Sequence, residues 1–272
     1  MARRQRVGPC VFCKRERRFT REHVIPRWVR KVLTTGPVEI RDRQTGGRLR
    51  YDQTLTLAVT DAVCMECNGG WLRLLGERVK DDVSEAILGR PLVMTFNRAK
   101  ALATWATERA LLFELAMREA RTARFAAESS LRWMYAYRDD PTPPPGTQVW
   151  MAYVDATTAL PAWSILGSWP EGPERAEGYI STFSLGCVVL LAFGQSYRES
   201  DQLAPDGRAL ARLELPGRLG GYVVPIWPEP DELIVWPPTF GLSMDDRTEL
   251  ANLLSTARIR RSYRAQLHRI DL

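Results

Sequence analysis

The sequence contains very little histidine. Among 272 residues there are two histidines, His23 and His268, against 38 lysines and arginines. A site that uses imidazole as a general base or a metal ligand must therefore draw on one of these positions. His268 lies among arginines near the end of the printed sequence, and we interpret it as a surface residue. His23 remains as the histidine with a candidate chemical role.

Long hydrophobic runs and nucleotide-binding glycine loops are also missing. The longest apolar stretch, residues 185–193, is much shorter than the roughly 18–20 residues that cross a bilayer, so we expect no membrane partner. The glycine-rich residues 217–221 lack the Lys-Ser/Thr pattern of a phosphate-binding loop. The basic N-terminal residues are not followed by the apolar core of a secretion signal. These absences favour a cytoplasmic protein whose cysteines stay reduced.

Cysteine is scarce, but its spacing is informative. Four of the five cysteines form two Cys-x-x-Cys pairs, Cys10 with Cys13 and Cys64 with Cys67. Two such pairs separated by tens of residues are typical of a four-thiolate zinc site, because each tight turn lets both thiolates point at one tetrahedral Zn²⁺. The alternatives are two disulfides or small buried apolar residues. Cys187, the fifth cysteine, is predicted to be buried in the core.

Three further polar residues lie close to these pairs in the sequence. Glu22 directly precedes His23, and Asn68 follows the second cysteine pair at once. An acid, a histidine and an amide held beside a zinc-binding turn can form a second metal site. In that arrangement zinc is structural, and a separate Mg²⁺-type ion takes part in the chemistry.

Residues 10–71 resemble HNH endonucleases of the zinc-stabilised kind, whose core is the treble-clef ββα-metal unit. The resemblance is carried by Glu-His-Val-Ile-Pro-Arg-Trp at residues 22–28 and by Cys-Asn-Gly-Gly-Trp at residues 67–71. Both segments are similar to an uncharacterised, largely actinobacterial group of HNH proteins. A looser similarity to that group covers the rest of the chain.

The resemblance implies a function for each of these polar residues. It makes His23 the general base that activates water, and it makes Glu22 and Asn68 the ligands of a catalytic Mg²⁺ or Mn²⁺. It assigns structural Zn²⁺ to the two cysteine pairs. The chain departs from the family pattern in two places. The family often has histidine where this chain has Asn68, and residues 58–63 lack the family's middle asparagine, for which Asp61 is a possible substitute.

Positive charge is concentrated near the candidate site. The net charge is +6, and residues 1–31 hold eleven arginines and lysines against two acids. Because guanidinium groups suit bidentate contacts with phosphate, we predict that Arg21 and Arg27 bind the backbone of a nucleic acid. The resemblance makes DNA the expected partner, with RNA as the alternative. Exposed arginines that merely keep the protein soluble are the opposing interpretation.

The pattern of the whole chain predicts an α+β protein. We expect a zinc-stabilised HNH nuclease domain over residues 1–90. A helical segment and an α+β domain with an antiparallel sheet and helices should follow over residues 91–272, with residues 140–146 as a proline-rich linker. Apolar periodicity predicts helices near residues 26–33, 67–88, 97–121, 129–137 and 243–267. Alternation predicts strands near residues 38–42, 48–52, 54–60, 147–154, 162–167, 179–193, 222–227 and 233–236.

The sequence therefore predicts a metal-dependent HNH endonuclease that hydrolyses phosphodiester bonds. The first alternative is a zinc-finger module that binds nucleic acid or a protein partner without catalysis. The second is a protein whose C-terminal half carries the function and uses the zinc unit as a scaffold.

Overall fold

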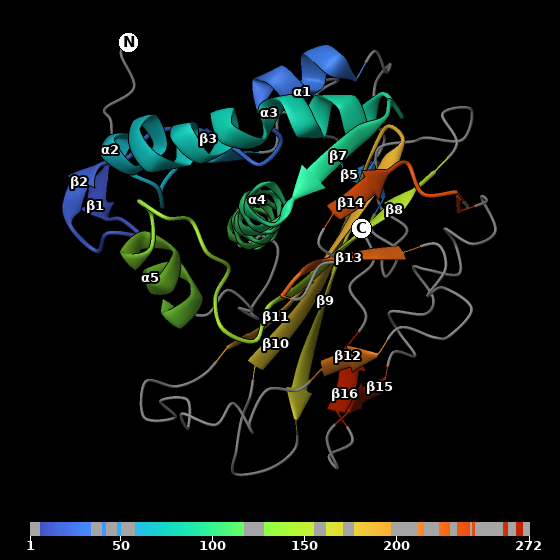
Figure 1. Ribbon diagram of the computed structural model, residues 1–272. Helices are drawn as coiled ribbons and strands as arrows, with labels where there is room; N and C mark the ends of the chain where they lie inside the picture. The colour runs from blue at the N-terminus through green and yellow to red at the C-terminus, as the bar shows by residue number, and fades with distance from the viewer. Residues whose placement is uncertain are drawn as a thin grey trace.

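The computed structural model mixes helices with antiparallel strands, which confirms the α+β class (Figure 1). It describes residues 6–33, 40–41, 48–49, 58–116, 128–154, 162–170, 177–196, 212–214, 223–228, 233–239, 241–242, 258–260 and 265–268. Within those ranges, no helix combines the length and the hydropathy needed to cross a membrane.

The N-terminal part is built from short strands and three helical segments. The strands are β1 (Val7–Pro9), β2 (Glu16–Arg18), β3 (Glu22–His23), β4 (Ile40–Arg41), β5 (Arg48–Leu49) and β6 (Ala58–Val59). They pair antiparallel as β1 with β2, β3 with β6 and β4 with β5. The helices are α1 (Arg27–Val32), α2 (Met65–Cys67) and α3 (Arg73–Ile87), and the π-type turn η1 (Asn68–Leu72) joins α2 to α3.

The predicted helix over residues 67–88 is interrupted near its start. Gly70 has φ −95° and ψ −111°, which is not helical, and the chain bends there before α3 begins. Helix α3 then buries one side of its surface through Leu75, Val79 and Val83, which recur at four-residue intervals. Gly89, with φ +67°, follows the helix, as a C-terminal glycine does when the chain turns left-handed.

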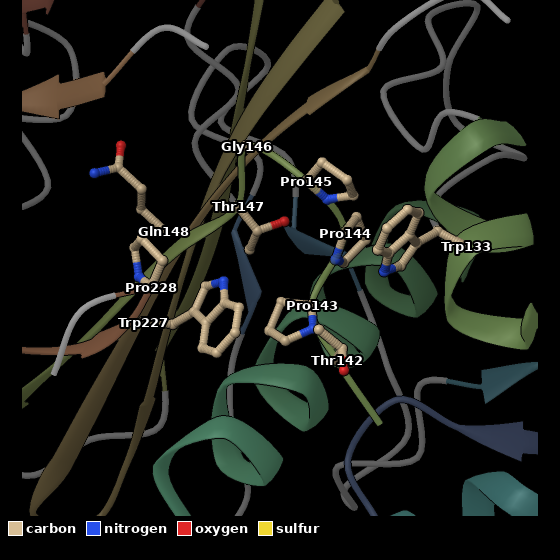
Figure 2. Close-up of a pocket in the computed structure, with 10 residues that line it drawn as sticks. All are labelled: Trp133, Thr142, Pro143, Pro144, Pro145, Gly146, Thr147, Gln148, Trp227 and Pro228. Carbon is tan, nitrogen blue, oxygen red and sulfur yellow. The ribbon is translucent and has the colours of Figure 1, made fainter. Parts of the chain in front are cut away.

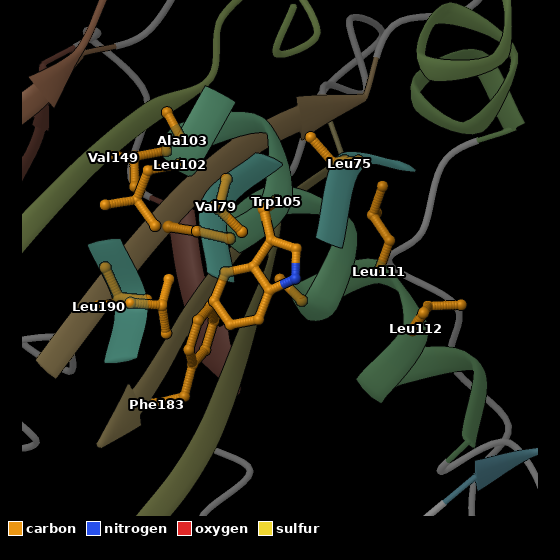
Figure 3. Packing of buried hydrophobic residues seen from close by; sticks show 14 of the residues in the cluster. Leu75, Val79, Leu102, Ala103, Trp105, Leu111, Leu112, Val149, Phe183 and Leu190 are labelled. Carbon is orange, nitrogen blue, oxygen red and sulfur yellow. The ribbon is translucent and has the colours of Figure 1, made fainter. Parts of the chain in front are cut away.

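Helix α4 (Phe96–Ala116) is the centre of the molecule. In Figure 1 it is seen almost end-on, between α3 and the main sheet. Nearly every residue from Ala99 to Leu115 is buried, so the helix is enclosed on all sides. Trp105, near the middle of the helix, is 1% exposed. Figure 3 shows its ring among Val79 of α3 and Phe183 and Leu190 of the sheet.

The main sheet has six strands in the order β13-β8-β11-β10-β9-β16. Their bounds are β8 (Gln148–Tyr153), β9 (Ala162–Pro170), β10 (Glu177–Leu185), β11 (Val188–Ser196), β13 (Val223–Trp227) and β16 (Ala265–His268). Two further antiparallel pairs are β7 (Leu92–Thr95) with β14 (Leu233–Trp236) and β12 (Arg212–Glu214) with β15 (Arg258–Arg260). Helix α5 (Glu128–Ala136) precedes the proline-rich segment, in which Pro141, Pro143 and Pro144 are buried.

One buried cluster joins the N-terminal unit to the sheet. It contains residues from both sides of position 90, from Cys10 and Val29 through α3 and α4 to Trp236. Cys187 is buried, as predicted, in the turn between β10 and β11. The elements that hold the candidate site are therefore packed against the same core as the sheet.

Two predicted elements are wrong. Residues 179–193 form a hairpin of β10 and β11 instead of one strand, because the chain reverses at Gly186 and Cys187. The predicted final helix over residues 243–267 contains strand β15 and most of β16, which pair with the distant strands β12 and β9. Arg258-Ile259-Arg260 alternates polar and apolar residues, which is the period of a strand. Parts of five other predictions lie outside the described ranges, namely residues 38–39, 42, 50–52, 54–57, 117–121 and 222.

The β10–β11 turn rests on the end of helix α3. The backbone N–H of Cys187 donates to the carbonyl of Ile87 at 2.9 Å, and Gly186 has φ +55°. A Cβ on Gly186 would lie 2.5 Å from that same carbonyl oxygen. The contact therefore requires glycine for both its φ angle and its lack of a side chain.

We predict that Gly186→Ala lowers the free energy of unfolding by about 2–4 kcal/mol, because it combines a positive φ with a backbone clash. Urea unfolding measures the change. Gly76→Ala in α3 is the matched control, since its nearest neighbour would be 4.0 Å from the new Cβ. That control should gain about 0.5–1 kcal/mol from helix propensity. Equal effects of the two substitutions would contradict the described contact.

Candidate metal centre and adjoining site

The four cysteines predicted to bind metal come together in space. The sulfur atoms of Cys10, Cys13, Cys64 and Cys67 all lie within 4.8 Å of one another. The sulfurs of Cys13 and Cys64 are 3.8 Å apart, and all five cysteines of the chain are free thiols. Tetrahedral zinc with Zn–S bonds of about 2.3 Å requires sulfur–sulfur distances of about 3.8 Å. The group can hold a metal ion, and its spacing is suited to zinc.

Backbone hydrogen bonds shape the first cysteine turn. The N–H of Lys14 donates to the carbonyl of Cys10 at 2.9 Å, and the N–H of Cys10 donates to the carbonyl of Arg15 at 3.1 Å. Lys14 takes φ +60°, which closes the turn within a few residues. The N–H of Val11 reaches across to the carbonyl of Ala62 at 2.9 Å. This last bond fixes the first turn beside the second.

The second cysteine pair opens helix α2. The sulfur of Cys64 accepts from the N–H of Cys67 at 3.4 Å, in the manner of a helix N-cap. The N–H of Cys64 in turn lies 3.5 Å from the sulfur of Cys10. Backbone donors directed at sulfur stabilise thiolates, which are the protonation state that binds metal.

The pKa values of the thiols differ strongly because the sulfurs are crowded. A hydrogen bond from Cys67 lowers the pKa of Cys10 to about 4. Burial raises the pKa of Cys64 to about 12, and the neighbouring Cys10 thiolate adds to this effect. The hydrogen bond to Cys10, followed by burial, raises the pKa of Cys67 well above its ordinary value. A cation among the four sulfurs would stabilise all of them as thiolates and so offset the raised pKa values of Cys64 and Cys67.

The candidate catalytic residues lie next to this centre. Glu22 and His23 form strand β3, which pairs with Ala58 and Val59 of β6, and both side chains are half-buried. The side-chain amide of Asn68 donates to the carbonyl of Arg21 at 3.4 Å. Asn68 is therefore held against the residue that immediately precedes Glu22. The structure brings the three predicted residues into one neighbourhood.

A buried arginine of α4, which the sequence analysis missed, binds the same strand. Arg109 is 2% exposed, and its Nη1 donates to Oε1 of Glu22 at 3.1 Å and to the carbonyl oxygen of His23 at 2.7 Å. Its Nε and Nη2 donate to the two carboxylate oxygens of Glu108, which is fully buried. Burial raises the pKa of Glu108 to about 7, and the nearby Glu22 adds to the increase. Two carboxylates thus share one guanidinium.

The missed pair did leave a signal in the sequence. Glu108 and Arg109 are adjacent charges directly before the apolar run of residues 110–113 in helix α4, and charged residues enclosed in a core are almost always paired. Their partner Glu22 is 87 residues away along the chain, so no local pattern identifies it.

Positive charge surrounds His23. Burial lowers the pKa of His23 to about 4, and Arg21, Arg27 and Arg30 contribute to the decrease. Arg21 and Arg27, the predicted phosphate contacts, are exposed, and Arg30 of α1 is half-buried. The Nε of Arg30 is buried and, among the described residues, has no hydrogen-bond partner. Arg30 was not predicted as a phosphate contact, although it follows Arg27 by three residues on α1.

The possible substitute Asp61 lies elsewhere on the surface. Its carboxylate pairs with Arg6 at 3.4 Å, and both side chains are more than half exposed. Such an exposed pair contributes little to stability.

Comparisons with protein-family models, with curated proteins and with solved structures found no match.

We predict that Cys13→Ser removes the bound metal, because Cys13 supplies one of four sulfur ligands. Elemental analysis of the purified chain should fall from about one zinc per chain to near zero. Cys187→Ser is the matched control, since Cys187 lies outside the group, and it should retain zinc. The assignment would be contradicted if both variants retained zinc or if both lost it.

We predict that Arg109→Met lowers the free energy of unfolding by about 3–5 kcal/mol, because it leaves the Glu108 and Glu22 carboxylates without their shared cation. Arg73→Met, which removes an exposed ion pair with Glu77, is the control and should cost about 0.5 kcal/mol or less. Denaturant unfolding compares the two variants. Similar losses would argue against a buried role for Arg109.

Proposed function

We propose that this chain is a metal-dependent endonuclease of the HNH type that hydrolyses phosphodiester bonds in DNA. The motifs around His23 and Asn68 resemble that family. The order of the elements supports the proposal, since a cysteine turn, the paired strands β3 and β6 and a helix opened by the second cysteine pair follow one another. A ββα-metal core has the same order. DNA is preferred to RNA because of the resemblance.

The contact between Asn68 and Arg21 is the strongest support for the proposal. The Asn68 amide contacts the carbonyl of Arg21, so the residue after the last cysteine lies beside the strand that bears Glu22 and His23. Asn68 is adjacent in sequence to Cys67, whose sulfur belongs to the four-cysteine group. In this proposal structural Zn²⁺ on the four cysteines fixes where Asn68 points.

The proposed reaction is the attack of water on the scissile phosphorus with release of the 3′ oxygen. Burial lowers the pKa of His23 to about 4, so its imidazole is neutral near pH 7 and has a free nitrogen to accept the proton of the attacking water. A pKa nearer to neutrality would make it a stronger general base. Glu22 and Asn68 offer a carboxylate and an amide oxygen to a divalent ion, and such oxygen ligands suit Mg²⁺ or Mn²⁺. When bound, that ion would stabilise the charge that develops on the phosphate and the leaving oxygen.

The arginines give the site its affinity for phosphate. Arg21, Arg27 and Arg30 approach His23 closely enough to depress its pKa. Guanidinium groups pair bidentately with phosphate oxygens, so the three residues suit contacts with the phosphates on either side of the cleaved bond. Arg30 is the strongest of the three candidates, since its Nε has no partner among the described residues.

A second candidate function is a zinc-stabilised module that binds nucleic acid or a protein partner without cleaving. The contact between Arg109 and Glu22 favours it, because a carboxylate oxygen that already accepts from a buried guanidinium is less available to a metal ion. The neutral amide of Asn68, in place of histidine, favours it as well. Both candidates use the same zinc centre and the same arginines.

We predict that the purified chain nicks or cuts plasmid DNA with Mg²⁺ or Mn²⁺, and that His23→Ala abolishes this activity while zinc content and thermal unfolding stay unchanged. His268→Ala, which replaces the second histidine, is the matched control and should cut normally. Gel electrophoresis of the plasmid measures the reaction.

The outcomes separate the two candidates. Cleavage that persists in His23→Ala would show that the general base is assigned wrongly. If the wild-type chain binds zinc and retards DNA in a gel but cuts with neither metal, the binding module is the better account.

A further inference from the structure

A small cavity adjoins helix α5. Its volume is about 250 Å³, and it lies between α5, the proline segment before β8 and the end of β13. Figure 2 shows its walls, which include Trp133, Pro143, Pro144, Thr147, Trp227 and Pro228. Two tryptophans and a row of prolines give the cavity flat, apolar sides.

Two polar atoms in these walls lack a partner. The indole Nε1 of Trp133 and the hydroxyl Oγ1 of Thr147 are buried and, within the described part of the chain, make no hydrogen bond. The Thr147 residue is only 3% exposed. In Figure 2 both atoms are turned toward the proline segment. Other buried atoms of the described chain, such as Nε1 of Trp71 and Trp236, also lack a partner, but Trp133 and Thr147 are the residues with such atoms that line the cavity. Because buried polar groups in proteins are usually paired, these two atoms are the hydrogen-bonding groups that the cavity offers to a ligand.

The tryptophan rings are held in place before any ligand arrives. Trp133 stacks on Tyr137 with ring centres 4.2 Å apart, and Trp227 packs against Phe96 with centres 6.1 Å apart. Rings that are already ordered lose little conformational entropy when a ligand stacks on them. The cavity is thus suited to a flat ligand.

The size and the charge of the walls restrict the ligand further. Sites for drug-sized molecules usually have volumes of roughly 300–1,000 Å³, so this cavity fits a smaller group of about one or two fused rings. The ten residues that line it include no acid, lysine or arginine. An ionised ligand would enter without a counter-charge, so the occupant is neutral.

A proline-rich peptide is a poorer match. Grooves for such peptides are elongated and lined by aromatic rings that receive prolines. Here the chain's own segment Pro143–Pro145 already lies beside Trp133. The remaining space is compact.

We propose that this cavity binds a neutral heteroaromatic ring of the nucleobase class, which stacks on a tryptophan and accepts a hydrogen bond from Trp133 Nε1–H. Thr147 Oγ1 can either donate to or accept from a second atom on the ring edge. A nucleobase offers acceptors and donors on adjacent edge atoms together with an apolar face. The ring can belong to a free nucleoside or to an unpaired base of a single strand, and the two sources offer the same chemistry.

Calorimetric titration of the full chain with the four common nucleosides, and with short single-stranded oligonucleotides, tests the proposal. Trp133→Phe keeps the aromatic face but removes the N–H donor, so we expect binding to weaken about fivefold to tenfold. Trp227→Leu removes a stacking surface and should weaken binding by more than tenfold. Tyr137→Phe is the matched control, since it changes a polar atom beside Trp133 but outside the cavity, and it should bind normally.

Each outcome decides a point. Binding of free nucleosides that weakens in Trp133→Phe supports a small-molecule site, and binding of oligonucleotides alone with the same dependence supports an unpaired base. The proposal would be overturned if no ring compound binds, or if binding is unchanged in all of the cavity variants. Binding of a polyproline peptide in place of the rings would also overturn it. His23→Ala should leave this binding intact, so the result is independent of nuclease activity. Thermal unfolding of each variant verifies that it is folded.

Discussion

The close approach of four sulfur atoms is the constraint on which the N-terminal half depends. Cys10 and Cys67 are far apart in sequence, yet their sulfurs lie within 4.8 Å, and backbone bonds such as that from Val11 to Ala62 lock the two turns together. Thiolates at this spacing repel one another unless a cation lies between them. A metal at this position would hold the first turn against the start of α2, and it would thereby fix Asn68 against Arg21.

Arg109 connects the core to the candidate site. Helix α4 is enclosed by apolar residues, but its one buried guanidinium within the described chain reaches the side chain of Glu22 and the backbone of His23. A buried ion pair of this kind is weak evidence for stability, because desolvation offsets most of the attraction, but removing one partner is strongly destabilising because it leaves an uncompensated buried charge. The short strand β3 is thus positioned by the core on one side and by the metal centre on the other.

The features that could be predicted from the sequence are those set by short-range spacing. The two Cys-x-x-Cys pairs identified the sulfur cluster, and the apolar run around Cys187 placed that residue in the core. The features that were not predicted depend on residues that are distant in sequence. The strands within residues 243–267 form because β12 and β9 pair with them, and Glu22 meets Arg109 because α4 packs behind β3. The partners in both cases are distant in sequence, so a helix was expected over residues 243–267 and Glu22 was expected only as a ligand of a metal ion.

X-ray absorption at the zinc edge of the purified chain tests the central claim most directly. If the two cysteine pairs hold one structural zinc ion, the spectrum will show four sulfur neighbours at about 2.3 Å and no nitrogen or oxygen ligand. Absence of zinc, or a first shell with nitrogen or oxygen at about 2.0–2.1 Å, would contradict the account. The sulfur cluster would then not be the centre that positions Asn68 beside Glu22 and His23.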